Sequence, residues 1–314
     1  MLSIVQPGPL LTIQDRGRVG ARRWGVPWSG ALDVFAHSAA NRLIGNSLDA
    51  ATLEITGGGC VVRFETICVL ALAGGNLNAT LNDEPIPLWR AVLVRAGAVL
   101  RFGSRRTGAR AYLAVGGGIL VEPQLGSRST LIGGPFAGLL GRPLRACDAL
   151  AFGVGDWNVA GRVWPLDQRP PYTLNPTVRY LRGPHSFAAS ERRRLHRTQW
   201  HVSPTSNRMG FRLAGGTLQP PTATLASLGV VPGTIQVPPD GAPIVLLADC
   251  QTTGGYPIIG TVINADLPLL AQLLPGDALR LQPTTLAIAE QAWREHQTQL
   301  AAPFADDLAW GAAV

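Results

Sequence analysis

The sequence predicts a mainly β protein with a few flanking helices. The 37 glycines and 25 prolines among the 314 residues are spread along the chain without a fixed period, which is typical of many short strands joined by tight turns. Hydrophobic residues make up 46% of the chain and charged residues only 15%, which favours a compact core over a disordered chain. Helical patterns are too few to alternate with the strands, as a parallel sheet with crossover helices would require.

Three segments have the periodicity of helices. In residues 29–46, apolar side chains recur on one face, with Ser29 as the expected N-cap and Gly45 as the stop. Residues 186–200 predict a second, arginine-rich helix, and residues 284–300 a third one near the C-terminus. Asp266 is expected to cap a shorter helix over "LPLLAQLL".

Strands are predicted where β-branched and apolar runs are bounded by Gly, Pro, Asn or Asp. These runs are "CVVRF", "ICVLALA", "AVLVRAGAVLRF", "ARAYLAV", "TIQV", "PIVLLA" and "IIGTVI". The last two flank "DCQTTGGYP" (residues 249–257), in which a Gly-Gly pair alone would satisfy a hairpin turn. The additional Gln, Thr and Tyr side chains exceed what a turn requires and therefore indicate a ligand site.

A recurring phrase predicts two related β units in tandem. "RAGAVLRFG", "RACDALAFG" and "PGDALRLQP" each combine a turn with a following strand. The proline-rich stretch "WPLDQRPPYTLNPT" (residues 164–177) has no periodicity and is the expected boundary. We therefore predict an N-terminal β domain over residues 1–165, a second over 166–285, and a C-terminal helix and tail over 286–314.

Several function classes are disfavoured by composition. The net charge of +7 comes from arginine, since the chain contains no lysine, and the basic run "ERRRLHR" is predicted to be a solvated helix face rather than a nucleic-acid site. The four cysteines and five histidines lack metal-ligand spacing, so no metal site is predicted and a reducing, cytoplasmic setting is expected. No apolar stretch is long enough to predict a membrane span.

Two polar clusters in the N-terminal half are candidate anion sites. Arg16 precedes a glycine-rich loop that leads into the first predicted helix, and backbone amides before a helix suit an anion. A packed connection in which Asp15 binds Arg16 or the backbone is an equal alternative. In "LGSRSTLIGG", Ser127 and Arg128 could bind a carboxylate or phosphate, although these residue types also form ordinary turns.

The C-terminal half contains further polar candidates. Asn207 and Arg208 lie just before Gly210, a plausible positive-φ position that would orient its neighbours. Gln236 lies within the apolar strand "TIQV", where an amide without a partner costs about 1–3 kcal/mol. A buried structural hydrogen bond is the alternative interpretation of Gln236.

The order of these clusters resembles one known family over nearly the whole chain. "TIQDRGR-G", "G-P-SGALD", "AN-L-GN", "LE-T-GG", "RAYLAV-GGI", "LGSRST", "SNRMGFRL", "PG-IQVPPDG-PIVLLAD" and "QTTGGYP" are together similar to the KipA family. That family includes the C subunits of 5-oxoprolinase and the related carboxyltransferase domain of urea carboxylase. The resemblance implies two tandem cyclophilin-like β-barrel domains, in agreement with the fold predicted from the residues.

The resemblance also implies a function. It favours the C subunit of an ATP-dependent 5-oxoprolinase, a hydrolase that converts 5-oxoproline to glutamate together with two partners, a LamB/YcsF-like protein and a KipI-like protein. ATP would be bound by the complex, and the chain alone would be inactive. One alternative is a component that transfers a carboxyl group from carboxybiotin to urea or a similar amide. Another is a non-catalytic KipA-type regulator that binds a KipI-like kinase inhibitor.

The resemblance further implies which residues bind the substrate. They are Asn207, Arg208, Gln236, Gln251, Thr252, Thr253 and Tyr256. Binding and transition-state stabilisation are expected of them, because none has the surroundings of an activated nucleophile. Many relatives place a lysine or arginine directly after "GGYP", where this chain has Ile258, and this departure disfavours biotin.

Overall fold

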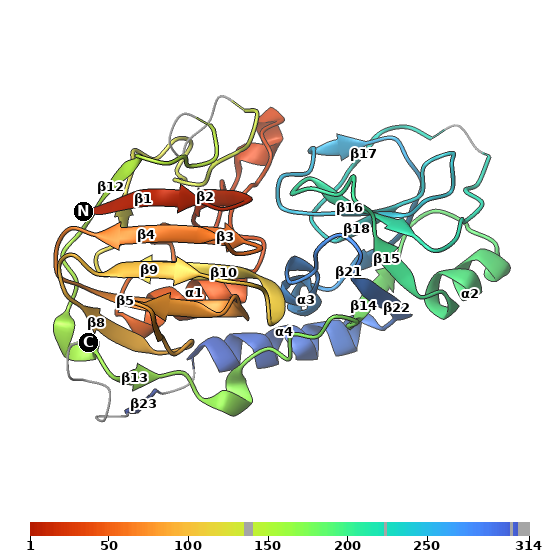
Figure 1. The fold of residues 1–314 in the computed structure, drawn as a ribbon. Coiled ribbons are helices and arrows are strands. Elements are labelled where there is room, and N and C mark those ends of the chain that lie inside the picture. Colours follow the sequence, from red (N-terminus) through yellow and green to blue (C-terminus); the bar gives the residue numbers. More distant parts are fainter. Residues whose placement is uncertain (135–140, 223–224, 302–303, 307–314) are drawn as a thin grey trace. The chain divides into compact units, whose positions relative to one another are not determined.

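The computed structural model describes residues 1–134, 141–222, 225–301 and 304–306 (Figure 1). The chain divides into two compact units. The first consists of Met1–Arg18, Ser29–Pro171 and Gln299–Val314, and the second of Val19–Trp28 and Tyr172–Thr298. The main division falls inside the proline-rich stretch that the sequence indicated. Residues 19–28 belong to the second unit, although the predicted ranges assign them to the first. The predicted C-terminal segment, residues 286–314, is divided between the two units after Thr298.

The first unit is built from two antiparallel sheets. The seven-stranded sheet contains, in spatial order, β11 (Ile119–Leu120), β12 (Ala149–Phe152), β1 (Leu2–Pro7), β4 (Cys60–Phe64), β9 (Val99–Phe102), β6 (Ala79–Leu81) and β7 (Glu84–Pro85). The five-stranded sheet contains β2 (Leu10–Gln14), β3 (Thr52–Thr56), β10 (Thr107–Val115), β5 (Cys68–Asn76) and β8 (Ala91–Val94). A short ladder joins β13 (Arg162–Val163) to β23 (Ala305–Asp306).

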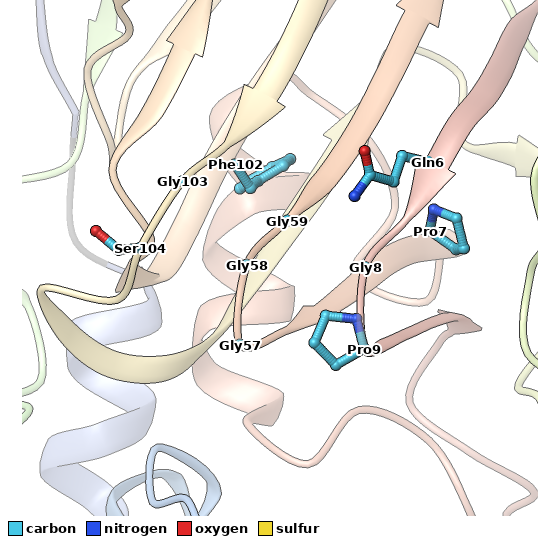
Figure 2. Close-up of a pocket in the computed structure, with 10 residues that line it drawn as sticks. All are labelled: Gln6, Pro7, Gly8, Pro9, Gly57, Gly58, Gly59, Phe102, Gly103 and Ser104. Carbon is cyan, nitrogen blue, oxygen red and sulfur yellow. The ribbon is translucent and has the colours of Figure 1, made fainter.

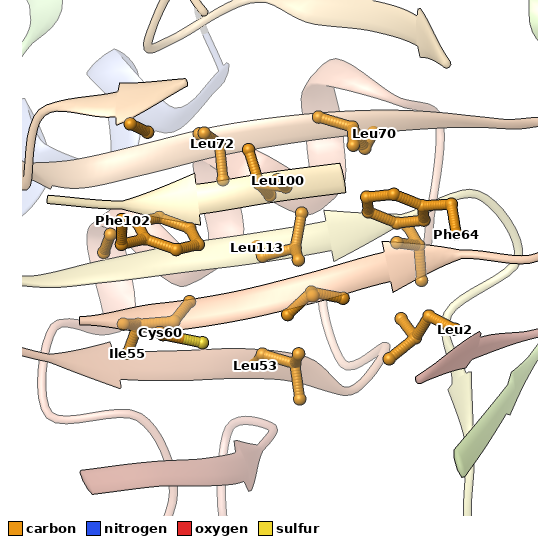
Figure 3. Close-up of a cluster of buried hydrophobic side chains, with 14 of the residues drawn as sticks. Leu2, Leu53, Ile55, Cys60, Phe64, Leu70, Leu72, Leu100, Phe102 and Leu113 are labelled. Atoms are coloured by element: carbon orange, nitrogen blue, oxygen red, sulfur yellow. The ribbon is translucent and has the colours of Figure 1, made fainter. Parts of the chain in front are cut away.

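The core of the first unit is a continuous cluster of apolar side chains drawn from both sheets (Figure 3). In β4, Cys60, Val62 and Phe64 are buried in this cluster, whereas Arg63 is exposed. This alternation follows from the two-residue period of a strand, which places successive side chains on opposite faces. Removal of this apolar surface from water is the main force that holds the two sheets together.

Helix α1 (Val34–Leu43) packs against β5 and β10 of the five-stranded sheet. It begins later than predicted, because Asp33 rather than Ser29 is the N-cap: the Asp33 carboxylate accepts a hydrogen bond from the Ala36 amide at 2.9 Å. Ser29 instead has a φ of 60°, within the turn that precedes the helix.

The second unit contains a closed barrel. Its strands are, in spatial order, β14 (Thr177–Arg182), β21 (Ile258–Val262), β18 (Thr234–Gln236), β19 (Ile244–Leu246), β16 (Gly210–Ala214), β15 (Trp200–Val202) and β22 (Ala278–Pro283). A separate ladder joins β17 (Leu228–Gly229) to β20 (Thr253–Gly254). The mainly β prediction is confirmed. The described strands of the first unit form the seven-stranded sheet, the five-stranded sheet and the β13–β23 ladder, and the closed barrel is found in the second unit.

Helices α2 (Ala189–Arg197) and α3 (Leu267–Ala271) lie within their predicted ranges with shorter bounds, and α4 (Leu286–Ala301) begins two residues and ends one residue later than predicted. The 3-10 turns, which the sequence did not predict, are η1 (Ala21–Trp24), η2 (Trp157–Val159), η3 (Leu166–Gln168) and η4 (Asn264–Asp266). Asp266 does not cap α3 through its side chain. Its carboxylate instead accepts hydrogen bonds from the backbone amide, Nε and an Nη of Arg179, at 2.6–2.9 Å.

The order of the barrel strands shows which strands "DCQTTGGYP" connects. The flanking strands β19 and β21 are not paired with each other, since each is hydrogen-bonded to β18, which lies between them. The segment is therefore not a hairpin turn: it is a crossing connection that passes β18. This topology places the crossing segment near Gln236, the last residue of β18.

Candidate functional site

The candidate site is centred on the side chain of Gln236 in the second unit. This side chain is 1% exposed, and its Nε2 atom has no hydrogen-bond partner among the described residues. A Cβ atom added at Gly254 would lie 2.4 Å from that nitrogen. The backbone of the crossing segment can therefore lie against the Gln236 amide only because residue 254 is a glycine. A larger residue at this position would displace the Gln236 side chain.

Apolar side chains surround this amide. In the barrel register, Gln236 is directly opposite Ile258 on β21 and Ile244 on β19. Ile258 is buried with Val230, Leu246 and Cys250, and Ile244 packs against the same cluster. An unpaired amide in such surroundings destabilises a fold by about 1–3 kcal/mol. Unsatisfied groups of this kind are concentrated at binding sites, because a ligand can complete them.

The other polar side chains of the crossing segment become more exposed from Gln251 to Thr253. Gln251 and Thr252 are half-buried, and Thr253 is exposed. The β17–β20 ladder holds this part of the segment by pairing Thr253 with Gly229 and Gly254 with Leu228. The structure thus brings four predicted residues, Gln236, Gln251, Thr252 and Thr253, into one region of the second unit.

Tyr256 faces an open groove beside this region. Its side chain is 46% exposed. The groove has a volume of about 660 Å³, and Tyr256 lines it together with Gly255, Pro257, Val237, Pro239 and the segment 217–222. Because Val237 directly follows Gln236, the groove adjoins the strand end that carries the unpaired amide.

Arg208 and Asn207 form internal contacts. Arg208 is 3% exposed and is paired with Asp249 by two hydrogen bonds, Nε–Oδ2 at 2.9 Å and Nη2–Oδ1 at 3.1 Å. Asn207 is exposed, and its Oδ1 accepts a hydrogen bond from the Met209 amide at 2.8 Å. A substrate carboxylate would have to compete with Asp249 for Arg208. Direct contact of Asn207 or Arg208 with a substrate stays a prediction. The Arg208–Asp249 pair, in contrast, anchors the first residue of the crossing segment.

The candidate anion site of the first unit holds a carboxylate of the protein itself. Asp15 is 5% exposed, and its side chain accepts hydrogen bonds from the amides of Gly17 and Arg128 and from the hydroxyls of Ser127 and Ser129, at 2.5–2.8 Å. The Ser127 hydroxyl and the Arg128 amide are thereby occupied, whereas Nε of Arg128 donates to the carbonyl oxygen of Val121 at 2.9 Å. The Asp15–backbone tie that was the alternative interpretation is present. Arg16 is half exposed and forms an ion pair with Asp49 at 3.6 Å.

A second depression, of about 540 Å³, lies in the first unit where three glycine-containing loops meet (Figure 2). A Cβ atom at Gly8 would lie 2.4 Å from the carbonyl oxygen of Gly58, and one at Gly58 would lie 2.0 Å from that of Gly103. These glycines are thus explained by the close approach of the loops. The depression adds no titratable side chain to the candidate site.

Groups of three or more His, Cys, Asp or Glu that could hold a metal are absent from the residues that the structure describes. Burial lowers the pKa of His37 to about 4, and burial raises the pKa of Cys60 and of Cys68 to about 12. In addition, the described part of the chain contains no helix that is long and apolar enough to cross a membrane.

Sequence reasoning missed three residues of the candidate site. Arg22 donates from Nη2 to the carbonyl oxygens of Gln251 and Thr252. His185 accepts a hydrogen bond at Nδ1 from the amide of Ile258, at 2.9 Å. Gly254 was predicted only as a turn residue. Arg22 is the first of the two arginines in "GARRWG", between two glycines, but nothing in that pattern indicates which segment it contacts.

Comparisons with known proteins agree over most of the chain. The profile of the family described as carboxyltransferase domain, subdomain A and B, matches residues 24–283. The chain is 39% identical to the 5-oxoprolinase C subunit of Escherichia coli over 315 residues, which covers 99% of this chain and 98% of that protein. It is 33% identical to the 5-oxoprolinase C subunit of Haemophilus influenzae, with 96% of each chain covered.

A solved structure supports the same assignment. Urea carboxylase of Kluyveromyces lactis superimposes with a TM-score of 0.88 at 29% identity, and the match covers 95% of this chain and 29% of that chain. The fold, the sequence match and the family profile each cover most of the chain, and the chain belongs to the carboxyltransferase family, subdomains A and B.

Proposed function

We propose that this chain is the C subunit of an ATP-dependent 5-oxoprolinase and contributes the lactam-binding site of a hydrolase complex. The observation that carries the proposal is the match to a 5-oxoprolinase C subunit along 99% of this chain and 98% of the relative. Because the match covers both chains almost completely, it favours the same role as a subunit over the role of one domain within a larger enzyme.

The chemistry of the candidate site is compatible with a cyclic amide. The Nε2 atom of Gln236 is a buried hydrogen-bond donor with no protein partner among the described residues, so it can donate to a lactam carbonyl oxygen. Such a hydrogen bond strengthens as negative charge develops on that oxygen during attack on the amide. The apolar walls from Ile258 and Val230 raise the strength of this interaction by excluding water.

The proposal includes partners and a nucleotide. A LamB/YcsF-like protein and a KipI-like protein would complete the enzyme in the cytoplasm, and the isolated chain would be inactive. ATP would be bound by the complex, and we assign no nucleotide site to this chain. Arg208 and Asp249 would keep the crossing segment in place, since they are paired at its base.

The test is glutamate release from 5-oxoproline and ATP by the chain purified together with its LamB/YcsF-like and KipI-like partners. The proposal predicts release by the complete complex and none when this chain is omitted. Stoichiometric assembly of all three proteins without any glutamate release would contradict it. The isolated chain serves as the control for background hydrolysis.

Carboxyl transfer to urea or a similar amide is the second candidate, favoured by the TM-score of 0.88 to urea carboxylase. The donor of Gln236 also fits the ureido carbonyl of biotin, which would bring the carboxyl group to be transferred. Ile258, however, places an apolar side chain beside that donor where the family resemblance implies a cation. This candidate predicts biotin-dependent carboxylation of urea that increases in Ile258→Lys, and no glutamate release from 5-oxoproline.

A further inference from the structure

The arginine at position 22 has an unusual set of partners. It lies in the 3-10 turn η1, between Gly20 and Gly25, whose φ values are 83° and 78°. Both glycines lie in the left-handed region that favours glycine, so the turn can be entered and left sharply. The side chain is half-buried and extends to the crossing segment of the second unit.

The Nη2 atom of Arg22 donates to three backbone carbonyl oxygens. They belong to Val230, to Gln251 at 3.1 Å and to Thr252 at 3.4 Å. Val230 follows β17, whereas Gln251 and Thr252 begin the polar part of the crossing segment. One guanidinium therefore links the two backbone segments on either side of the β17–β20 ladder, where the amide of Val230 also donates to the carbonyl of Thr252 at 3.1 Å.

These two segments determine where Gly254 lies. A Cβ atom at Gly254 would be 3.4 Å from a methyl group of Val230 and 2.4 Å from Nε2 of Gln236. A shift of either segment would thus change the space above the unpaired amide. The planar guanidinium is suited to fix several acceptors at once, which a lysine ammonium on a flexible stem does less well.

We propose that Arg22 is a positioning residue that holds the crossing segment against Gln236, so that residues 19–28 form part of the candidate site. Arg22 has no assigned contact with substrate; it acts through the backbone of Gln251, Thr252 and Val230. The kinetic part of this inference rests on the proposed 5-oxoprolinase function, and the structural part does not.

A cysteine beside Arg22 offers a readout that is independent of catalysis. Sγ of Cys250 lies 3.9 Å from Nη1 of Arg22, and the cysteine is fully buried. Burial raises the pKa of this thiol, and the nearby Arg22 charge opposes that rise. Cys60 and Cys68 are buried in the first unit, and Cys147 is exposed. In a Cys147→Ser background, thiol labelling of the second unit therefore reports on Cys250.

The first experiment measures the rate at which iodoacetamide modifies Cys250 in the Cys147→Ser chain, with the modified peptide identified by mass spectrometry. Arg22→Ala is expected to increase this rate at least ~10-fold, because the crossing segment opens while the unit stays folded, and this increase outweighs the slower reaction caused by the higher thiol pKa without the Arg22 charge. Arg23→Ala is the matched control, since Arg23 is exposed and lies over the ring of Trp24 at 4.2 Å. An Arg22→Ala rate equal to that of Arg23→Ala in a folded chain would overturn the proposal.

The second experiment uses the complete complex with 5-oxoproline and ATP. Arg22→Ala is expected to raise the KM for 5-oxoproline at least ~10-fold and Arg22→Lys to restore only part of it. General destabilisation would instead lower the amount of active enzyme and leave KM unchanged, which would contradict a positioning role. If the wild-type complex releases no glutamate, the proposed function fails, and the labelling rate alone then decides whether Arg22 holds the segment.

Discussion

Asp15 in the first unit and Gln236 in the second are both buried polar residues near glycine-rich loops, yet their surroundings are opposite. The Asp15 carboxylate accepts four hydrogen bonds from the amides of Gly17 and Arg128 and from the hydroxyls of Ser127 and Ser129. The Nε2 atom of Gln236 has no partner within the described chain and lies among apolar side chains. The Asp15 carboxylate is satisfied by protein donors, whereas Nε2 of Gln236 is left without a hydrogen-bond partner among the described residues.

This difference separates a structural cluster from a candidate binding site. A saturated cluster stabilises the fold, and its removal leaves donors unsatisfied. An unsatisfied donor destabilises the fold and persists where function requires it. Stability and activity should therefore respond in opposite ways to substitutions in the two places.

The largest effect on stability is expected from Asp15→Ala. The substitution leaves two backbone amides and two hydroxyls without their acceptor, so we expect the free energy of unfolding to fall by about 3–5 kcal/mol. Urea denaturation followed by circular dichroism measures it. Asp49→Ala is the control: the Asp49 side chain is 73% exposed, and its ion pair with Arg16 should contribute less than about 1 kcal/mol. Equal effects of the two substitutions would show that the Asp15 cluster is not a structural anchor.

Acid should destabilise the first unit through His37. Burial lowers the pKa of this histidine to about 4, while the nearby carboxylates of Asp15 and Glu54 oppose the shift. The unfolded chain takes up the proton near its ordinary pKa of 6.5, so the stability that neutral His37 provides is present above pH 6.5 and is lost as the pH falls towards 4. The loss approaches about 3 kcal/mol.

The pH effect is measured as the free energy of unfolding of the wild type and of His37→Gln at pH 7, 5.5 and 4.5. The difference between the two curves isolates His37, because the other titrating groups are common to both chains. We expect the wild type to lose more stability than the variant over this interval. Parallel curves would show that His37 is not held in its neutral form.

Gly254→Ala should impair the candidate site with little effect on the fold. The new methyl group would lie 2.4 Å from the end of the Gln236 side chain, which can move aside, and Gly254 has no left-handed φ that would strain alanine. We expect kcat/KM for 5-oxoproline to fall about 10- to 100-fold in the complete complex, because the donor is displaced from its position. Gly229→Ala is the matched control, since nothing lies within 4 Å of its added Cβ. Equal turnover in the two variants would argue against Gln236 as the substrate donor.

The predictable part of the fold was the part carried by local pattern. The strands "CVVRF" and "ICVLALA" were predicted from composition, and the division between the units falls in the proline-rich stretch around Pro171. Pattern alone could not show that β18 lies between β19 and β21, because strand pairing depends on contacts distant in sequence. The hairpin interpretation of "DCQTTGGYP" failed for that reason.

For the candidate site, too, the sequence indicated residues but not their contacts. Residue type and family resemblance indicated Gln236 and the crossing segment, which the structure brings together. The same reasoning grouped Ser127 and Arg128 as donors for an anion without showing that Asp15 accepts from the Ser127 hydroxyl and the Arg128 backbone amide. It also could not show that Asp249 is already the partner of Arg208. Whether a polar group already has hydrogen-bond partners depends on residues that are distant in the sequence, so it cannot be predicted from local pattern.

The most direct test of the central claim is the free energy of unfolding of Gln236→Met in the isolated chain, measured by urea denaturation. Methionine keeps the length of the side chain and removes the unpaired amide. If Gln236 is left unsatisfied for a ligand, the variant should be more stable than the wild type by about 1 kcal/mol. A loss of stability of similar size would mean that the Gln236 amide already has a structural partner, and it would contradict the account.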